Sequence, residues 1–183
     1  IGINDGNNFS KLTARTKTGV DPDLDKINQI LIEKKLINIK DTKRMTSDQF
    51  FGKNNKKFDI ILVDGFHCCM QVYRDVKNAL LTLNDSGIIV LHDCNPMGKE
   101  RQEKHGANGD VWKAINFFSK VDFLNVVTMN CDQGLGIIKI KDSKDNVINY
   151  IKSMDRELPE KYANLKYEYL EKNRKEVLNL VKA

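Results

Sequence analysis

Two apolar runs that end in polar residues decide the fold: FDIILVDGFH at residues 58–67 and GIIVLHDCNP at residues 87–96. The apolar parts, Ile60–Val63 and Ile88–Leu91, are short and bounded by turn signals. Runs of this kind are typical of strands buried on both faces, as in a parallel sheet. The sequence therefore predicts two buried parallel strands, each followed directly by residues that can carry chemistry.

The segment between the two runs, residues 68–86, has apolar side chains at helical spacing, namely Met70, Tyr73, Val76, Leu80 and Leu83. A strand, a helix and a strand form a βαβ unit, whose right-handed crossover makes the strands parallel. Neighbouring strands lie about 4.8 Å apart, so their carboxyl ends meet at one edge, where open α/β sheets bind ligands. The polar residues expected around one crevice there are Asp64, His67, His92 and Asp93.

Length and composition indicate one globular domain over residues 1–183, with an α/β core to residue 141 and C-terminal helices over 142–183. The net charge is +5, with acidic and basic residues mixed along the chain, which does not favour a nucleic-acid partner. No apolar run approaches the roughly 18 residues of a membrane span. The four cysteines include no CxxC pair, so reduced thiols and a cytoplasmic protein are expected.

The flanking segments predict the remaining elements. The chain starts at what looks like the end of a strand, so the first strand is expected to be truncated. Further strands are predicted over 18–21, 36–39, 123–129 and 135–140. Helices are predicted to about residue 15, over 24–35, after a Ser47 N-cap, from residue 110, and over 144–154 and 159–181. Gly134 and Gly136 indicate a tight hairpin, which makes the last two strands antiparallel.

The opening residues combine a glycine turn with an acidic residue further on. Gly2 and Gly6 lie where a strand gives way to a helix, and glycine there lets a ligand approach the backbone. Asp21 ends the next strand, where doubly wound sheets bind ribose hydroxyls. Ordinary tight packing and a turn-forming Asp before Pro22 are the alternatives. A GxGxxG fingerprint is absent, so a pyrophosphate site is not supported.

Six segments in this order resemble the class I S-adenosylmethionine-dependent methyltransferases: IGINDGNNF, GVDPD, MTSDQFF, FDIILVDGFHCCMQVYRDV, GIIVLHDCNP and GDVWKAI. The subgroup is the one with Asp-Gly-x-His and His-Asp-x-Asn-Pro segments. The resemblance covers residues 1–140. It implies a Rossmann-like, doubly wound sheet of about seven strands in the order 3-2-1-4-5-7-6, with strand 7 antiparallel.

The resemblance also implies a cofactor, S-adenosyl-L-methionine, and residues that bind it. Those expected along its methionine part are Gly2, Asn4 and Gly6. Asp21 is expected to hold the ribose hydroxyls, and Ser47 and Asp48 to border the adenine, although Asp48 can equally start a helix. Asp64 is expected to face the methionine end of the cofactor or the acceptor.

A hydroxyl acceptor must also lose its proton, and the residues offer two routes. His67 is a candidate general base, with Asp64 beside it as the second candidate catalytic residue. The alternative is a divalent cation held by Asp64, His92 and Asp93, which would acidify the hydroxyl. Some sugar O-methyltransferases of similar fold bind Mg²⁺ with acids at such positions. The histidine ligand here suits Mn²⁺, Fe²⁺ or Zn²⁺ better than Mg²⁺. A third interpretation is structural, with Asp93 capping the turn into Asn95 and Pro96.

The leading function is therefore methylation of a small-molecule hydroxyl, for which a sugar or glycoconjugate is the expected class. A non-catalytic cofactor-binding or interaction module of the same fold is an alternative. A nicotinamide-dependent oxidoreductase is disfavoured by the missing GxGxxG, and a nucleic-acid methyltransferase by the missing Asn/Asp-Pro-Pro-Tyr signature. No membrane partner is expected, and the long C-terminal helix is a candidate homodimer contact.

Overall fold

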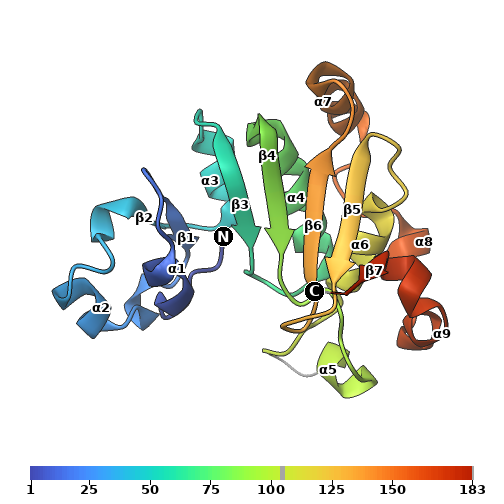
Figure 1. Cartoon of the computed structure of the whole chain (residues 1–183), viewed down its shortest axis with the longest axis horizontal. Helices are drawn as coiled ribbons and strands as arrows, with labels where there is room; N and C mark the ends of the chain where they lie inside the picture. The colour runs from blue at the N-terminus through green and yellow to red at the C-terminus, as the bar shows by residue number, and fades with distance from the viewer. Residues whose placement is uncertain (104–105, 183) are drawn as a thin grey trace. The chain divides into compact units, whose positions relative to one another are not determined.

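The computed structural model describes residues 1–103 and 106–182. They form two compact units, Ile1–Asn55 (unit 1) and Lys56–Ala183 (unit 2), each with a sheet of its own (Figure 1). Helices and parallel strands alternate, so the α/β class is confirmed. The prediction of one domain over residues 1–183 stays a prediction. Within the described part of the chain, no helix is long and apolar enough to cross a membrane.

Unit 1 contains a two-stranded parallel sheet, in which β1 (Gly19–Asp21) pairs with β2 (Thr42–Arg44). Its core consists of Phe9, Ile27 and Ile37. The helical segments are α1 (Asn7–Lys11), the 3₁₀ turn η1 (Leu24–Lys26), α2 (Gln29–Glu33), the 3₁₀ turn η2 (Ile39–Asp41) and α3 (Ser47–Lys53). Residues 1–3 form no strand, although the Gly2 amide donates to the Val20 carbonyl at 2.8 Å.

Three predicted elements of unit 1 differ from the structure. The helix expected to about residue 15 ends at Lys11. The strand expected over residues 36–39 is not formed, because Ile37 packs in the core at 1% exposure and the partner of β1 is the polar β2. The helix expected over residues 24–35 is interrupted, because the Asn28 side chain accepts from the Ile30 amide at 3.0 Å and starts a new helix there. The predicted strand ending at Asp21 is confirmed.

Unit 2 contains a five-stranded sheet in the order β3-β4-β6-β5-β7. The predicted βαβ unit is confirmed, since β3 (Phe58–Val63) and β4 (Leu83–Leu91) are parallel and joined by α4 (Cys69–Thr82). The hairpin is confirmed too, since β6 (Leu135–Ile140) runs antiparallel to β5 (Leu124–Met129) and to β4. The whole seven-strand order stays a prediction, because β1 and β2 form a separate sheet.

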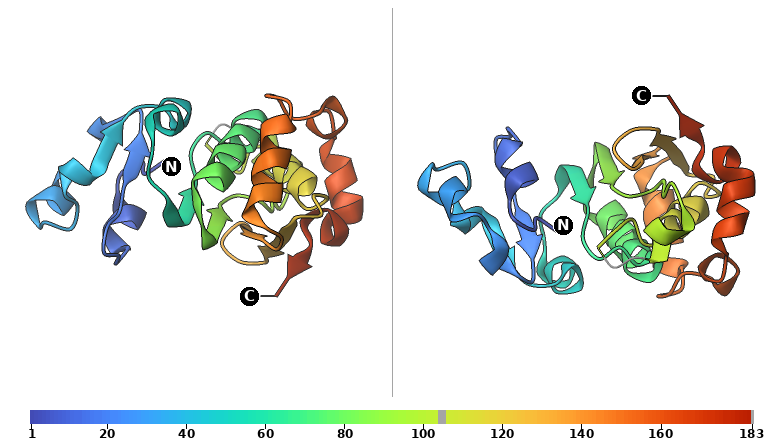
Figure 2. Two further views of the ribbon diagram at one scale, coloured as in Figure 1. Left: turned by 90° about the horizontal axis from the view of Figure 1, so that it is seen from above. Right: turned by 90° about the horizontal axis from the view of Figure 1, so that it is seen from below.

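The remaining elements of unit 2 are α5 (Lys99–Glu103), α6 (Trp112–Phe118), α7 (Lys144–Ser153), α8 (Glu160–Ala163), α9 (Tyr167–Leu178) and β7 (Leu180–Val181). The continuous helix expected over residues 159–181 is therefore wrong. Lys166 is extended and separates α8 from α9, and Asn179, at φ 44°, ends α9 before β7 pairs with β5. Figure 2 shows α9 and β7, coloured red, at one end of unit 2.

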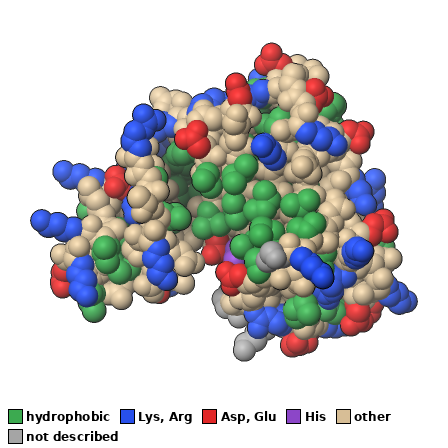
Figure 3. Space-filling view, viewed as in Figure 1, with side chains coloured by type: hydrophobic (Ala, Val, Ile, Leu, Met, Phe, Trp, Pro, Cys, Tyr) green, Lys and Arg blue, Asp and Glu red, His purple; other side chains and the backbone are tan. Residues whose placement is uncertain are grey.

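The two faces of this sheet differ in burial. Alternate residues such as Ile61, Val63 and Ile89 are buried, with α4 and α6 behind the strands in Figure 1. On the other face Ile60 is 65% exposed and Ile88 is half-buried, and Figure 3 shows hydrophobic side chains gathered there. The prediction that these strands are buried on both faces therefore holds for one face only.

Candidate active site

Strands β3 and β4 bring the predicted polar residues to one edge of the sheet. Val63 lies opposite Leu91, and the His92 amide donates to the Val63 carbonyl at 3.1 Å. Asp64 and the pair His92-Asp93 therefore leave neighbouring strand ends, as the sequence predicts. His67 returns to the same edge from the turn that precedes α4.

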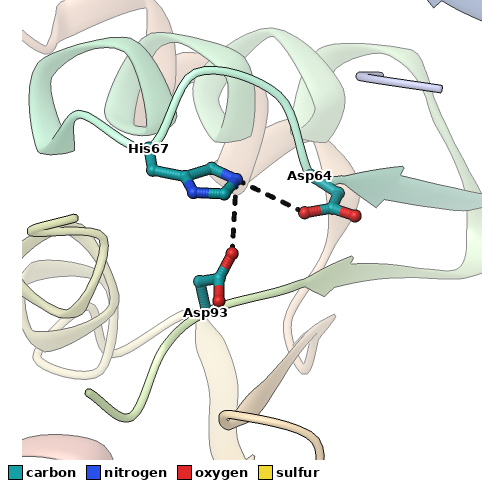
Figure 4. A group of neighbouring side chains, drawn as sticks. All are labelled: Asp64, His67 and Asp93. Carbon is teal, nitrogen blue, oxygen red and sulfur yellow. Dashed lines mark ion pairs between the residues drawn. The ribbon is translucent and has the colours of Figure 1, made fainter. Parts of the chain in front are cut away.

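Four side chains meet there, and we call them the Asp–His quartet: Asp64, His67, His92 and Asp93. Asp64 Oδ1 lies 3.5 Å from His67 Nε2 and 3.3 Å from His92 Nδ1. Asp93 Oδ2 lies 3.2 Å from His67 Nε2 and 3.1 Å from His92 Nδ1. Nitrogen and oxygen atoms thus alternate around a ring, and Figure 4 shows the His67 nitrogen between the two carboxylates.

Each imidazole has an acceptor on its outer nitrogen as well. His67 Nδ1 lies 2.6 Å from the Ala107 carbonyl, which can only accept, so this nitrogen carries a proton. His92 Nε2 lies 3.4 Å from Asp132 Oδ2, in the turn between β5 and β6. The inner nitrogen of each ring must therefore either carry a second proton or face a cation, because ionised carboxylates offer only lone pairs.

The protonation of the quartet without an ion follows from these contacts. Partial burial would raise the pKa of Asp64, but hydrogen bonds from His67 and His92 outweigh it and lower this pKa to about 2. Hydrogen bonds to Asp64 and then to Asp93 raise the pKa of His92 to about 10. The hydrogen bond to Asp64 likewise raises the pKa of His67. Both nitrogens of His67 and of His92 face acceptor oxygens, so without an ion these contacts favour the doubly protonated form of each ring.

Asp93 is held in an unusual backbone conformation. Its φ is 63°, in the left-handed region, and it is 3% exposed. The neighbouring amides of Cys94 and Asn95 donate to Gly134 O and Gln133 O at 3.0 and 2.8 Å, so these amides are capped by the β5–β6 turn. The Asp93 carboxylate instead lies against both imidazoles. The structural interpretation, with Asp93 capping its own turn, therefore has less support than a role in the quartet.

The quartet includes a candidate metal site. Ligand atoms of one small divalent ion lie about 3.0–3.4 Å apart when ion–ligand distances are about 2.1 Å. Three of the four ring distances, at 3.1–3.3 Å, lie in this range, and the distance from Asp64 Oδ1 to His67 Nε2, at 3.5 Å, lies just above it. Asp64, His67 and Asp93 alone offer three such atoms within 4.8 Å of one another. Outer-nitrogen acceptors like Ala107 O are also the usual second partners of metal-binding histidines.

The predicted cofactor residues of unit 1 form a turn with unusual backbone angles. Gly2, Asn4 and Gly6 all have positive φ, at 74°, 45° and 83°. At Gly6 an added Cβ would lie 2.4 Å from Ile37 Cδ1, so packing in the core of unit 1 adds to the preference for glycine that φ 83° sets. Asp21 accepts from the Asn4 amide at 3.0 Å and from the Asp23 amide at 2.9 Å. A carboxylate has about four acceptor sites, so Asp21 can still receive the two ribose hydroxyls.

The start of α3 differs from the prediction in one residue. Thr46 is the N-cap, in a capping box with Gln49, and Ser47 is the first helical residue. The Ser47 N-cap is therefore wrong, because the Thr46 hydroxyl already receives the Gln49 amide. Asp48 lies in the first helical turn, where its charge favours the helix dipole. The adenine contacts expected for Ser47 and Asp48 stay predictions.

Two participants had no signal in the sequence. Ala107 contributes only its carbonyl, which any residue could offer. Asp132 stands in a polar turn that resembles many others, and only the placement of β6 beside β4 brings it to His92. The sequence predicts His67 at the same crevice but as a base and not as a metal ligand, whereas the structure places it against Asp64 and Asp93, which also contact His92.

Comparisons with known proteins indicate the family of the chain. A family model described as a methyltransferase domain matches residues 3–94, half of the chain. No curated protein matches. A crystal structure of a protein from Corynebacterium glutamicum is similar with a TM-score of 0.53 and 14% identity, over 70% of this chain and 62% of that one. At this identity the likeness concerns the fold. With the family match it shows that the chain belongs to the class I S-adenosylmethionine-dependent methyltransferases.

Proposed function

We propose that this protein methylates a hydroxyl oxygen of a small-molecule acceptor, of which sugars and glycoconjugates are the leading class, with a divalent cation held by the Asp–His quartet. The observation that carries the proposal is the alternation of two imidazoles and two carboxylates at 3.1–3.5 Å. When bound there, the cation would supply a Lewis acid that favours loss of the hydroxyl proton.

The reaction moves a methyl group from the cofactor sulfonium to the oxygen and releases one proton. Such an in-line displacement depends mainly on how the acceptor is oriented. The quartet supports this because Asp64, His92 and Asp93 follow two paired strand ends, and the two imidazoles contact Ala107 O and Asp132. Gly2, Asn4, Gly6 and Asp21 are the proposed cofactor-binding residues, as the family implies.

Charge balance favours a divalent ion. Replacing the two inner protons of doubly protonated imidazoles by one ion of charge +2 leaves the charge of the quartet unchanged. Two nitrogen and two oxygen ligands favour Zn²⁺, Fe²⁺ or Mn²⁺ over Mg²⁺, which prefers oxygen. Buried neutral sites avoid the desolvation penalty of a net charge.

The general-base role of His67 has weaker support. A base needs a lone pair facing the acceptor, but His67 Nδ1 donates to Ala107 O and Nε2 faces Asp64 and Asp93. The hydrogen bond to Asp64 also raises the pKa of His67, which favours its protonated form. We therefore propose His67 as a ligand of the ion.

Mn²⁺ or Zn²⁺ is expected to stabilise the purified, chelator-treated protein. At an ion concentration 100 times Kd, binding to the folded state alone adds about 2.7 kcal/mol, which raises Tm by roughly 5–10 °C. Asp93→Asn is expected to abolish this rise. Asp122→Asn, which changes an exposed residue outside the quartet, is expected to keep it. Differential scanning calorimetry measures both. An equal rise in wild type and Asp93→Asn would exclude the quartet as the binding site.

Asp21→Asn is expected to weaken S-adenosylmethionine binding about 10- to 100-fold, because hydrogen bonds to a charged acceptor contribute about 1.5–3 kcal/mol. Asp41→Asn makes the same chemical change in unit 1 and is the matched control. Isothermal titration calorimetry with the cofactor gives both affinities. If Asp21→Asn binds as tightly as Asp41→Asn, Asp21 does not hold the ribose.

A further inference from the structure

The loop after β4 connects the quartet to the C-terminal helix α9. Asn95 is 2% exposed, and its backbone amide donates to Gln133 O at 2.8 Å. Its side-chain nitrogen donates to Asn130 Oδ1 at 3.1 Å, and its side-chain oxygen accepts from Arg174 Nη1. The backbone N–H and both side-chain polar atoms of Asn95 are thus held by segments distant in sequence.

Arg174 joins three acceptors at once. Besides Asn95 Oδ1, its Nη1 donates to the Pro96 carbonyl at 2.9 Å, and its Nη2 donates to the Tyr167 hydroxyl at 2.8 Å. The buried Tyr167 hydroxyl in turn donates to Pro96 O at 3.4 Å. The planar guanidinium suits such a set because its donors are fixed in direction, which a lysine ammonium cannot reproduce.

The helix is distorted next to this residue. Asn173 has φ −121° and ψ 18° inside α9, and its side chain donates to Tyr169 O at 2.9 Å. The flanking Lys172 and Lys175 are exposed, whereas Arg174 is half-buried. One cation of a charge-rich helix is therefore directed inward, at the loop that carries Asp93.

We propose that Arg174 is a positioning residue of the active site, acting through Asn95 and Pro96 to hold Asp93 against both imidazoles. This inference rests on the proposed function insofar as the quartet is the reactive centre. A left-handed aspartate costs about 1 kcal/mol, and it persists only where the surrounding structure holds it. Without Arg174, the Asn95 side chain and the Pro96 carbonyl each lose a hydrogen-bond donor. Asp93 can then relax to negative φ and withdraw Oδ2 from the quartet.

The alternative is that Arg174 only fastens α9 to the core. Val177→Ala tests this, because Val177 is 1% exposed in the same helix and its truncation loosens the packing without removing a hydrogen bond of the loop. Lys172→Met controls for the loss of a positive charge. Arg174→Lys keeps the charge and part of the hydrogen bonding.

The experiment records the imidazole nitrogens of ¹⁵N-histidine-labelled, metal-free protein at one pH by long-range ¹H–¹⁵N NMR. The chain has three histidines, which single His→Gln variants assign. In Arg174→Met, the signals of His67 and His92 are expected to move toward those of Asp93→Asn, with Arg174→Lys in between. Val177→Ala and Lys172→Met should keep wild-type signals, and the Zn²⁺ affinity of Arg174→Met should fall about 10-fold.

The inference is overturned if Arg174→Met keeps wild-type signals while Asp93→Asn changes them, or if Val177→Ala moves them as far as Arg174→Met does. The proposed function fails in a different way. If Zn²⁺ leaves the His67 and His92 nitrogens of the wild type unshifted, the quartet holds no zinc, and the metal-free comparison still decides the role of Arg174. If Asp93→Asn changes nothing, Asp93 does not contact the imidazoles and both ideas are abandoned.

Discussion

Asp64→Asn is expected to lower methyl transfer by about 10²-fold or more, the loss that follows when a group that stabilises developing charge or binds a catalytic ion is removed. Asparagine keeps the shape of the side chain but removes the charge that faces His67 Nε2 and His92 Nδ1 at 3.5 and 3.3 Å. The remaining carboxylate, Asp93, would then face two imidazoles alone. Ion binding and the rate should fall together.

Two measurements check this result. Transfer of labelled methyl from S-adenosylmethionine to a panel of mono- and oligosaccharides gives the rate, and titration with Mn²⁺ gives the ion affinity. Asp122→Asn, which removes an exposed carboxylate of unit 2, is the matched control and should behave as wild type in both. An Asp64→Asn protein with wild-type Mn²⁺ affinity would exclude the quartet as a metal site. If that protein also fails to transfer the methyl group, Asp64 acts on the acceptor and not on an ion.

Gly109→Ala is expected to cost about 3 kcal/mol of unfolding free energy and to disturb His67. Gly109 has φ +61°, and an added Cβ would lie 1.8 Å from the His67 carbonyl oxygen. The clashing atom belongs to the backbone and cannot rotate away as the end of a side chain can. The loop that contains Gly109 must therefore move. The amide of the next residue, Asp110, donates to His67 O, and Ala107 O accepts from His67 Nδ1. A displaced loop therefore releases the imidazole.

Gly106→Ala is the matched control for this variant. Gly106 also has positive φ, at +76°, but nothing lies within 4 Å of an added Cβ. Only the conformational penalty of about 1 kcal/mol remains. Urea unfolding should thus separate the two variants by about 2 kcal/mol, and Mn²⁺ affinity should fall in Gly109→Ala alone. Equal losses in both variants would mean that the loop accommodates the methyl group and does not hold His67 rigidly.

The sequence predicts the quartet well because the βαβ unit is governed by local rules. Short apolar runs, a helix with a clear apolar face and a right-handed crossover place Asp64 beside His92 without knowledge of the rest. The same rules predict the antiparallel hairpin from Gly134 and its neighbours.

The parts that fail depend on contacts distant in sequence. Ile37 looks like a strand residue but packs into the small core of unit 1. Residues 159–181 look like one solvated helix, yet Arg174 is drawn inward by carbonyl and amide oxygens of the loop after β4. The position of Asp132 likewise follows from the pairing of β6 with β4. None of these contacts leaves a pattern in its own segment.

The quartet comes from one short part of the chain, and this has a consequence for how the protein folds. All four residues lie between positions 64 and 93, directly after β3, before α4 and after β4, whereas the β5–β6 turn and α9 join the loop from residues 130–134 and 174. Closing a short segment costs less chain entropy, so local pairings form sooner than distant ones. We therefore expect the segments that carry the reactive groups to come together early in folding, and Asp93 to reach its final position when the β5–β6 turn and α9 dock.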